Sequence, residues 1–367
     1  PYRALWLLVL AACTEQAPRP AAQPGPPPSL PSMRAEPGVE RASLRLGRAP
    51  AMYRLAKDAQ VPLERTAPAA PEPSGFLGKP ERRELEQLAS GAVTSAKKAS
   101  GRRTLAFELA LDSGVSAVFE PEQRVSRANW YAQIAAYYLD RALGLGRVPP
   151  VVARKLAWPQ LQAAAGQDAR QRKVVVGSDG QVRGALVLSL KDELVPALTP
   201  AGWESWIRGE PARPNEVSPY QREHEPRGRE VRYQQPPEPQ PSELPAELSD
   251  MILFDFLTLN DDRFGAGNAN ILTLGKAGPL VFVNNGAAFS PGPARRARLL
   301  PLAKFRKRTV DALRAFDVRA FGTKLAADPL GPFLDESMLR GIGERRDAVL
   351  QHIAEQERRY GAGVYAW

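Results

Sequence analysis

The chain has 367 residues, enough for one large domain or two ordinary ones, and 43% of them are hydrophobic, so it can bury a core. The net charge of +10 arises from 50 Lys and Arg against 40 Asp and Glu, and these charges are interspersed, which argues against a nucleic-acid surface. A single cysteine excludes an intrachain disulfide, and two histidines argue against a His/Cys metal site or a Ser-His-Asp triad.

The first residues resemble a bacterial export signal. Arg3 precedes a short apolar run over residues 4–12, which is too short to span a bilayer as a finished helix. The letters LAAC that end at Cys13 resemble the lipobox, in which the cysteine is lipidated and becomes the new N-terminus. We therefore expect residues 1–13 to be a lipoprotein signal peptide that directs export to the bacterial cell envelope. An ordinary secretory signal is the alternative, and both take the protein out of the cytoplasm.

Proline divides the remaining chain. The 36 prolines crowd residues 18–75 and 211–245, whereas the stretches between them carry apolar periodicity. We interpret residues 14–79 as a Pro/Ala-rich tether, because such a composition is extended and cannot build a core. The charged, proline-rich stretch 205–246 is predicted to be a disordered insert, either an inert loop or a docking segment.

The first half of the folded part reads as strands, one helix and more strands. Residues 104–111 and 116–120 alternate as strands, and helical spacing follows over 124–145. Further strands are expected at 173–177 and 182–190.

The second half is expected to be mostly helical. An apolar helix over 250–259 leads into a polar loop, and a hairpin then delivers the letters NNGAAF over 284–289. Two helical patterns complete this half, at 303–316 and 336–360.

Three runs in this order resemble the secretory-pathway casein-kinase and four-jointed family of atypical kinases. The first is QIAAYYLDR over 133–141 followed by RVPPV, the second is DMILFDFLTLNDDR over 250–263, and the third is NNGAAF. The resemblance extends over roughly residues 104–350. It implies an α+β, two-lobed protein-kinase-like fold, with a β-rich N-lobe at 80–190 and an α-rich C-lobe at 191–367.

The resemblance also implies roles for single residues. Asp262 matches the catalytic carboxylate that orients the attacking hydroxyl. The alternative is that Asp262 only pairs with Arg263 or caps a turn. Asn268 and Asn284 match positions that bind a metal ion and, with it, the nucleotide.

Three positions depart from the family's pattern. Glu120 stands where a lysine would bind phosphate, Gln133 stands where a glutamate would hold that lysine, and Asn284 replaces the metal-binding aspartate. A carboxylate near phosphate is unfavourable, since two unit charges 4 Å apart repel by about 4 kcal/mol at an effective dielectric of about 20. Gln133 avoids placing a second carboxylate against Glu120, which indicates a retuned site rather than random decay.

Two classes of function follow from these departures. The first is a pseudokinase, or strongly impaired phosphotransferase, that serves as a binding or regulatory module. The second is an active kinase that phosphorylates hydroxyls of secreted protein or glycan, with a substitute cation such as Arg124 or Lys98. The cofactor would be ATP with Mg or Mn, or none.

A cluster of basic side chains past Asn284 indicates a partner. It would suit an acidic protein or glycan, and a solvated basic face is the alternative. Its members are Arg295, Arg296, Arg298, Lys304, Arg306, Lys307 and Arg308.

The lipobox interpretation makes a direct prediction. Expressed with this N-terminus in a Gram-negative host, the protein should partition with membranes and carry lipid on Cys13, whereas Cys13→Ala should release it. Mass spectrometry of the N-terminal peptide checks the modification. Unchanged partitioning of the variant, together with an unmodified wild-type peptide, would contradict the interpretation.

Overall fold

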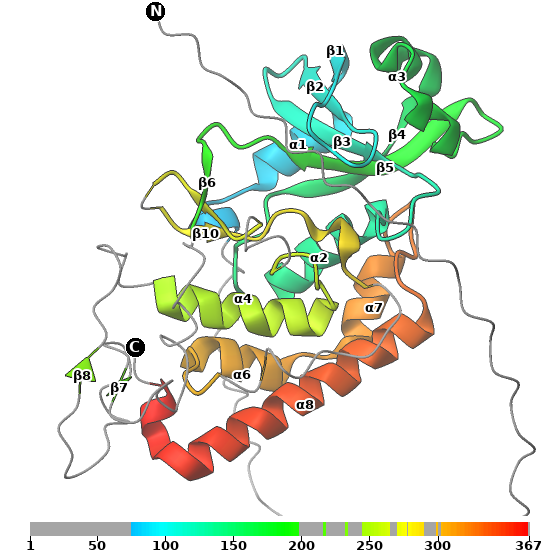
Figure 1. Ribbon diagram of the computed structural model, residues 1–367. Coiled ribbons are helices and arrows are strands. Elements are labelled where there is room, and N and C mark those ends of the chain that lie inside the picture. Colours follow the sequence, from blue (N-terminus) through cyan, green and yellow to red (C-terminus); the bar gives the residue numbers. More distant parts are fainter. Residues whose placement is uncertain are drawn as a thin grey trace, which may run out of the picture. The chain divides into compact units, whose positions relative to one another are not determined.

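The computed structural model describes residues 75–197, 216–217, 232–233, 244–264, 270–276, 278–289, 299 and 302–365. The predicted signal peptide with Cys13, and most of the predicted tether and insert, lie outside these ranges. The described residues form two lobes, one built on an antiparallel sheet and the other mostly helical (Figure 1).

A five-stranded antiparallel sheet forms the first lobe. Its strands alternate between buried and exposed side chains, as the period of two in the sequence predicts; Phe107, Leu109 and Leu111 face the core of the lobe. Gly114, in a left-handed conformation at φ 78°, makes the turn to the next strand. Across the sheet the strands are β1 (Val93–Lys98), β2 (Phe107–Leu111), β3 (Ser116–Pro121), β5 (Gln181–Leu188) and β4 (Val151–Ala157).

The predicted strand at 173–177 is wrong. The chain forms a short 3-10 helix at Ala169–Lys173, followed by one isolated bridge between Val174 and Gln123. The Asp168 side chain accepts a hydrogen bond from the Arg170 amide and pairs with its guanidinium, which favours the turn over an extended strand.

Besides the 3-10 helix at Ala169–Lys173, three α-helices and a 3-10 turn accompany the sheet. The predicted helix at 124–145 is shorter than expected, because Arg127 is left-handed at φ 55° and Gly144 is left-handed at φ 63°. The helical elements are the 3-10 turn η1 (Phe76–Gly78), α1 (Arg82–Ser90), α2 (Trp130–Ala142) and α3 (Trp158–Ala165).

The second lobe contains helices and short strands. The apolar helix predicted at 250–259 is present as part of α4 and begins earlier, with Pro245 in its first turn. The predicted helix at 303–316 is shorter, and α7 was not predicted. The elements are β6 (Leu194–Pro196), β7 (Glu216–Val217), β8 (Arg232–Tyr233), α4 (Leu244–Thr258), β9 (Leu272–Leu274), β10 (Leu280–Val281), the 3-10 turn η6 (Asn285–Ala287), α6 (Lys307–Ala315), α7 (Val318–Ala326), α8 (Glu336–Tyr360) and the 3-10 turn η7 (Gly361–Tyr365).

Two hydrophobic cores hold the lobes. The smaller one lies between the sheet and α3, and it includes Phe107 and Phe119. The larger one joins α2 to α4, α6, α7 and α8, so α2 packs with the helical lobe although it follows the sheet strands in sequence (Figure 1). Helix α2 is therefore the element through which the position of one lobe is set against the other.

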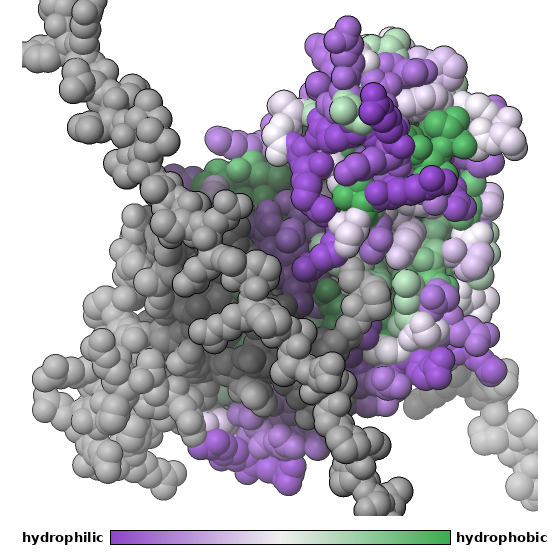
Figure 2. All heavy atoms as spheres, turned by 45° about the vertical axis from the view of Figure 1, so that its right-hand side comes forward, coloured by the Kyte–Doolittle hydropathy of each residue, from purple (hydrophilic) through white to green (hydrophobic). Residues whose placement is uncertain are grey.

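The described surface is mostly hydrophilic in the view of Figure 2, with smaller hydrophobic areas. Val176, 41% exposed, is the large hydrophobic side chain that stands out among the described residues. None of the described helices combines the length and the apolarity needed to cross a bilayer.

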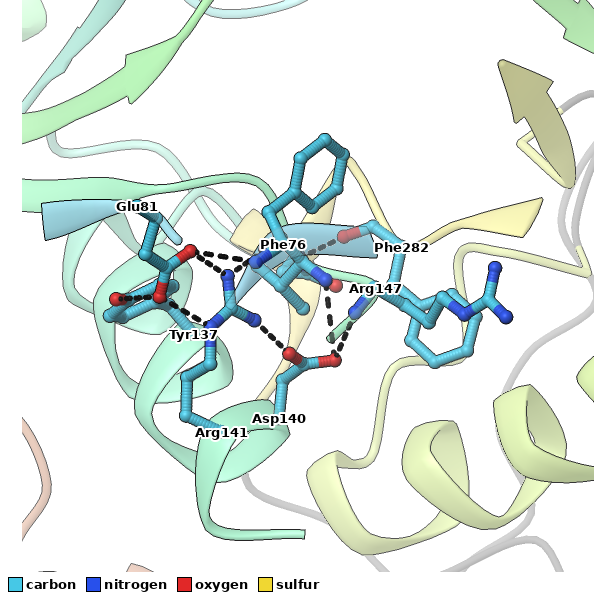
Figure 3. Close-up of polar contacts among 9 residues, drawn as sticks. Phe76, Glu81, Tyr137, Asp140, Arg141, Arg147 and Phe282 are labelled. Carbon is cyan, nitrogen blue, oxygen red and sulfur yellow. Dashed lines mark hydrogen bonds and ion pairs between the residues drawn. The ribbon is translucent and has the colours of Figure 1, made fainter. Parts of the chain in front are cut away.

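A buried guanidinium fixes α2 (Figure 3). Arg141 donates from Nε and Nη2 to the two carboxylate oxygens of Glu81 at 2.7 and 2.6 Å, and Tyr137 donates to the same carboxylate at 2.7 Å. Arg141 also pairs with Asp140, and its Nη2 donates to the carbonyl of Val148 at 2.8 Å. The segment ahead of α1 is thereby tied to α2.

The same network reaches the second lobe. Asp140 Oδ1 accepts hydrogen bonds from the amides of Arg147 and Val148 at 2.9 and 3.2 Å. The carbonyl of Arg147 in turn accepts one from the amide of Phe282 at 2.9 Å, at the end of β10. One chain of hydrogen bonds therefore connects residues near the start of the folded part with the strand that leads into the NNGAAF segment.

Charge pairing decides the protonation of Glu81. Burial alone would raise the pKa of this carboxyl, but hydrogen bonds from Arg141 and Tyr137 outweigh it and hold the pKa below its ordinary 4.5. The unfolded chain therefore binds this proton more readily than the folded chain does. The stabilisation is present above about pH 4.5 and is lost as the pH falls toward the lowered value.

Removing the guanidinium should be costly, because it leaves the Glu81 and Asp140 carboxylates without their cation. The side chains of Arg141 and Glu81 are only 6% and 13% exposed. We therefore expect Arg141→Met to lower the free energy of unfolding by about 3–5 kcal/mol. Arg82→Met is the matched control, because its pair with Glu86 is 92% and 63% exposed and should contribute less than about 1 kcal/mol. Urea unfolding measures both, and equal losses would contradict this account.

Candidate active site

Two adjoining cavities of about 350 and 390 Å³ lie where the sheet meets the loops of the helical lobe. Both are in the size range of small-molecule sites. They share four lining residues, namely Arg102, Glu120, Gln133 and Asn284. The predicted site residues that the structure describes therefore lie around one cleft, and Asp262 lines the first cavity with them.

Glu120 lies near the end of β3, at the boundary between the cavities. On the neighbouring strand β5, Gly184 lies opposite Pro121, and a Cβ there would stand 2.4 Å from the Glu120 carbonyl oxygen and 2.7 Å from the ring of Phe119. Only glycine permits this approach, so Gly184 allows β5 to pack closely against β3 at the position where Glu120 enters the cleft.

Gln133, buried in the second turn of α2, bridges the two lobes. Its Nε2 donates to Glu120 Oε2 at 2.9 Å, and its Oε1 accepts from the amide of Asn285 at 3.3 Å. A glutamine can do both, because its amide carries donors and an acceptor. A glutamate at this position would have no hydrogen to donate to Glu120.

Arg102 supplies the cation beside Glu120. Its Nη1 lies 2.9 Å from Glu120 Oε1, and it comes from the loop between β1 and β2. The sequence-based candidates for a substitute cation do not take this place: Lys98 pairs with Asp168 at 3.2 Å, and Arg124 is exposed. Neither of them lines the two cavities.

The ion pair that holds the loop after α4 is not the Asp262–Arg263 pair considered from the sequence. Arg263 is fully buried and pairs with Asp255 at 2.8 Å, not with Asp262. It also donates to the Val283 carbonyl at 2.6 Å and to Asn285 Oδ1 at 2.7 Å, which ties the loop to the NNGAAF segment. The Asp262 carboxylate is thus left exposed at the cavity.

Two asparagines stand near Asp262. Asn284, left-handed at φ 59°, donates from Nδ2 to Asn270 Oδ1 at 3.2 Å, and Asn270 donates to the Asp262 carbonyl at 3.1 Å. Asn268, the amide expected here, lies outside the described residues. Asn270 is the amide that the sequence analysis missed, and its place just before β9 was the available signal.

The second cavity is mostly apolar. Its walls come from β3, from the Pro149 region, from the chain after β5 and from the strands of the helical lobe. The apolar lining residues are Val118, Val148, Pro149, Val151, Val187, Leu188, Leu190, Leu194, Leu272, Phe282 and Val283. A flat, weakly polar group fits such walls, whereas the first cavity is lined mainly by charged and amide side chains.

The fold is similar to those of solved structures of a Fam20 protein and of the Golgi casein kinase. Hydra Fam20, in a structure with sugar, gives a TM-score of 0.55 at 19% sequence identity over 76% of this chain and 89% of that chain. The Golgi casein kinase gives a TM-score of 0.55 at 17% identity over 79% and 80%, and its structure with Mn/ADP bound gives the same values. No family model matches the chain, and no curated protein matches it significantly.

The chain has a kinase-like fold. The predicted α+β, two-lobed architecture is confirmed, and the resemblance seen in the three sequence runs is supported at the level of structure. Identities of 17–19% establish the fold and leave the activity open.

The cleft contains an ion pair, but its members differ from those expected from the resemblance. The strand position carries the acid Glu120, the helix position carries the neutral Gln133, and the cation Arg102 comes from a loop. The charge arrangement expected from the family's pattern is therefore replaced by one with the opposite sign on the strand.

Among the residues that the structure describes, the donors at the cleft suit a divalent metal ion of the usual kinase kind poorly. Mg²⁺ prefers carboxylate oxygens, but Asn284 is neutral and the Asn270 oxygen already accepts a hydrogen bond from it. In the described part of the chain, no group of three or more His, Cys, Asp or Glu side chains is placed to hold a metal.

The described members of the predicted basic cluster are largely occupied. Lys304 is buried, Arg306 pairs with Asp250 at 3.4 Å, and Lys307 pairs with Asp311 at 2.7 Å, whereas Arg308 is exposed. Arg295, Arg296 and Arg298 lie outside the described residues.

The contact between Glu120 and Gln133 can be tested by exchange. Gln133→Glu should place two carboxylates in contact and lower the free energy of unfolding at pH 7 by about 1–3 kcal/mol. Adding Glu120→Gln should restore most of the loss, because the amide and the carboxylate then simply trade places.

Urea unfolding of the wild type, both single variants and the double variant gives the coupling energy, expected at about 0.5–3 kcal/mol for groups in contact. The Gln133→Glu defect should also shrink as the pH falls, since one carboxyl of the pair can then take up a proton. Additive effects of the two substitutions would contradict the hydrogen bond.

Proposed function

We propose that this chain is an extracytoplasmic kinase-like protein that acts as a pseudokinase or strongly impaired phosphotransferase, with a regulatory or binding role. The observation that carries the proposal is the contact of Gln133 with Glu120 at 2.9 Å, where a protein kinase would have a lysine held by a glutamate. An acid on the strand repels phosphate, and a neutral helix residue cannot hold a cation.

The cleft supports nucleotide binding nevertheless. An apolar cavity of about 390 Å³ adjoins a polar one of about 350 Å³, as a ligand with a flat base and an anionic tail requires. The Golgi casein kinase, which shares the fold, has been solved with Mn/ADP bound. Metal binding is less well supported than nucleotide binding, because Asn284 stands where the resemblance implies a metal-binding carboxylate.

An active kinase is the second candidate, and one observation favours it. Asp262 lines the polar cavity with an exposed carboxylate, while Arg263 beside it is bound to Asp255. A carboxylate in this state can accept a proton from a substrate hydroxyl. The acceptor would be a hydroxyl of a secreted protein or glycan, and hydra Fam20 has been solved with sugar.

The setting of the protein is part of the proposal. The lipobox-like letters ending at Cys13 support export and a lipid anchor in a bacterial envelope. The basic balance of the chain, +10 overall, supports an acidic protein or glycan as partner.

Restoring the missing groups distinguishes the two candidates. We expect little Mg²⁺-dependent phosphate transfer from the wild type, and little gain from any single replacement, because these groups act as a unit. The triple variant Glu120→Lys, Gln133→Glu and Asn284→Asp should gain slow autophosphorylation, measured with radiolabelled ATP. Adding Asp262→Ala should abolish the gain.

Two other outcomes are informative. Robust wild-type transfer that disappears with Asp262→Ala would contradict the pseudokinase and support the active kinase. Robust transfer that survives Asp262→Ala would contradict both, because the chemistry would then lie elsewhere.

A further inference from the structure

The backbone of the loop that carries Arg102 is held in place by hydrogen bonds from Arg170. Arg170 donates to the carbonyls of Arg102 and Thr104 at 2.5 and 3.1 Å, and Asp168 anchors Arg170 with a second ion pair at 2.6 Å. The backbone of the loop is therefore fixed, and the Arg102 side chain extends from it to the boundary between the two cavities.

Glu120 orients the Arg102 side chain but does not use all of its hydrogen-bond donors. A guanidinium has five N–H donors, and the pair with Glu120 engages Arg102 through Nη1 alone, at 2.9 Å. The two side chains are 35% and 19% exposed, so solvent weakens their attraction and leaves Arg102 able to bind another anion. Glu120 acts here as a positioning residue.

The polar cavity contains an excess of positive charge. Arg102, Arg103 and Arg127 line it against the acids Glu120 and Asp262. Arg103 donates to the carbonyls of Ser126 and Arg127 at 3.0 and 2.9 Å, which holds the turn where Arg127 is left-handed at φ 55°.

The turn presents a second cation to the same space. Arg127 is exposed, and its guanidinium makes no hydrogen bond or ion pair to a residue within the described ranges. Left-handed backbone is unfavourable at a non-glycine residue and persists where surrounding contacts hold it. Here those contacts are the two donations from Arg103.

We propose that Arg102, oriented by Glu120 and assisted by Arg127, binds the phosphate chain of a nucleoside di- or triphosphate without a divalent metal. This inference rests on the proposed nucleotide site and identifies the cation of that site. The ion pair of an ordinary kinase cleft persists in it, with the acid moved to the strand and the cation moved to the loop. Arginine suits the task, because its planar fork matches phosphate oxygens.

The test compares four probes in EDTA, which removes divalent metals: ATP, ADP, adenosine and inorganic tripolyphosphate, each titrated into the whole chain by calorimetry. We expect ATP to bind the wild type without metal and Arg102→Ala to weaken it about tenfold to hundredfold, as loss of charge-assisted hydrogen bonds implies. Adenosine affinity should stay unchanged. Arg102→Lys should retain more affinity than Arg102→Ala.

Arg124→Ala is the matched control, because Arg124 is an exposed arginine outside both cavities. Glu120→Gln removes both the partner that orients Arg102 and a charge that repels phosphate, so it should change ATP affinity less than Arg102→Ala does, and it should leave adenosine binding intact. Thermal unfolding without ligand verifies that each variant is folded.

The outcomes separate this inference from the proposed function. If ATP binds and Arg102→Ala has no more effect than Arg124→Ala, the inference is overturned and the nucleotide site stands. If ATP binds only with Mg²⁺ or Mn²⁺, metal-free binding is overturned in the same way. If no probe binds, with or without metal, both the inference and the nucleotide site fall.

Discussion

The position of α2 depends on one buried cation. The Arg141 guanidinium neutralises Glu81 and Asp140 at once, in a place where either carboxylate alone would be costly to bury. Because α2 belongs to the core of the helical lobe and carries Gln133, this network sets where the amide of Gln133 meets Glu120. The geometry of the cleft therefore depends on contacts that lie outside it.

The cleft itself shows how a fold can keep its shape when the charges of its site change. Gln133 satisfies a strand acid and a backbone amide from the opposite lobe with one side chain, so the junction between the lobes stays hydrogen-bonded without a lysine. Arg263, locked between Asp255 and Asn285, keeps the two loops together in the same way. These supports are structural, and they remain in place whether or not phosphate is transferred.

Sequence alone predicted the fold class, because the runs around Gln133, Asp262 and Asn284 are local and ordered along the chain. It did not predict Arg102, because strand β1 was not recognised and the residues after it could not be seen as a loop facing Glu120. The contact joins residues on different elements, and an arginine in a charged chain carries no signal of its own. Helix α2 was predicted too long for a related reason: the left-handed backbone at Arg127 depends on the hydrogen bonds from Arg103.

The way the folded part begins has a mechanical consequence. The amide of Leu77 donates to the Gly146 carbonyl at 2.8 Å, and Glu81 is bound to α2 a few residues later. A pulling force applied to the chain ahead of Gly75 would thus reach the Glu81–Arg141 pair before it reaches the sheet. Once the η1 turn has yielded, the load would pass to α2, and tension on this end of the molecule would act on the spacing of Gln133 and Glu120.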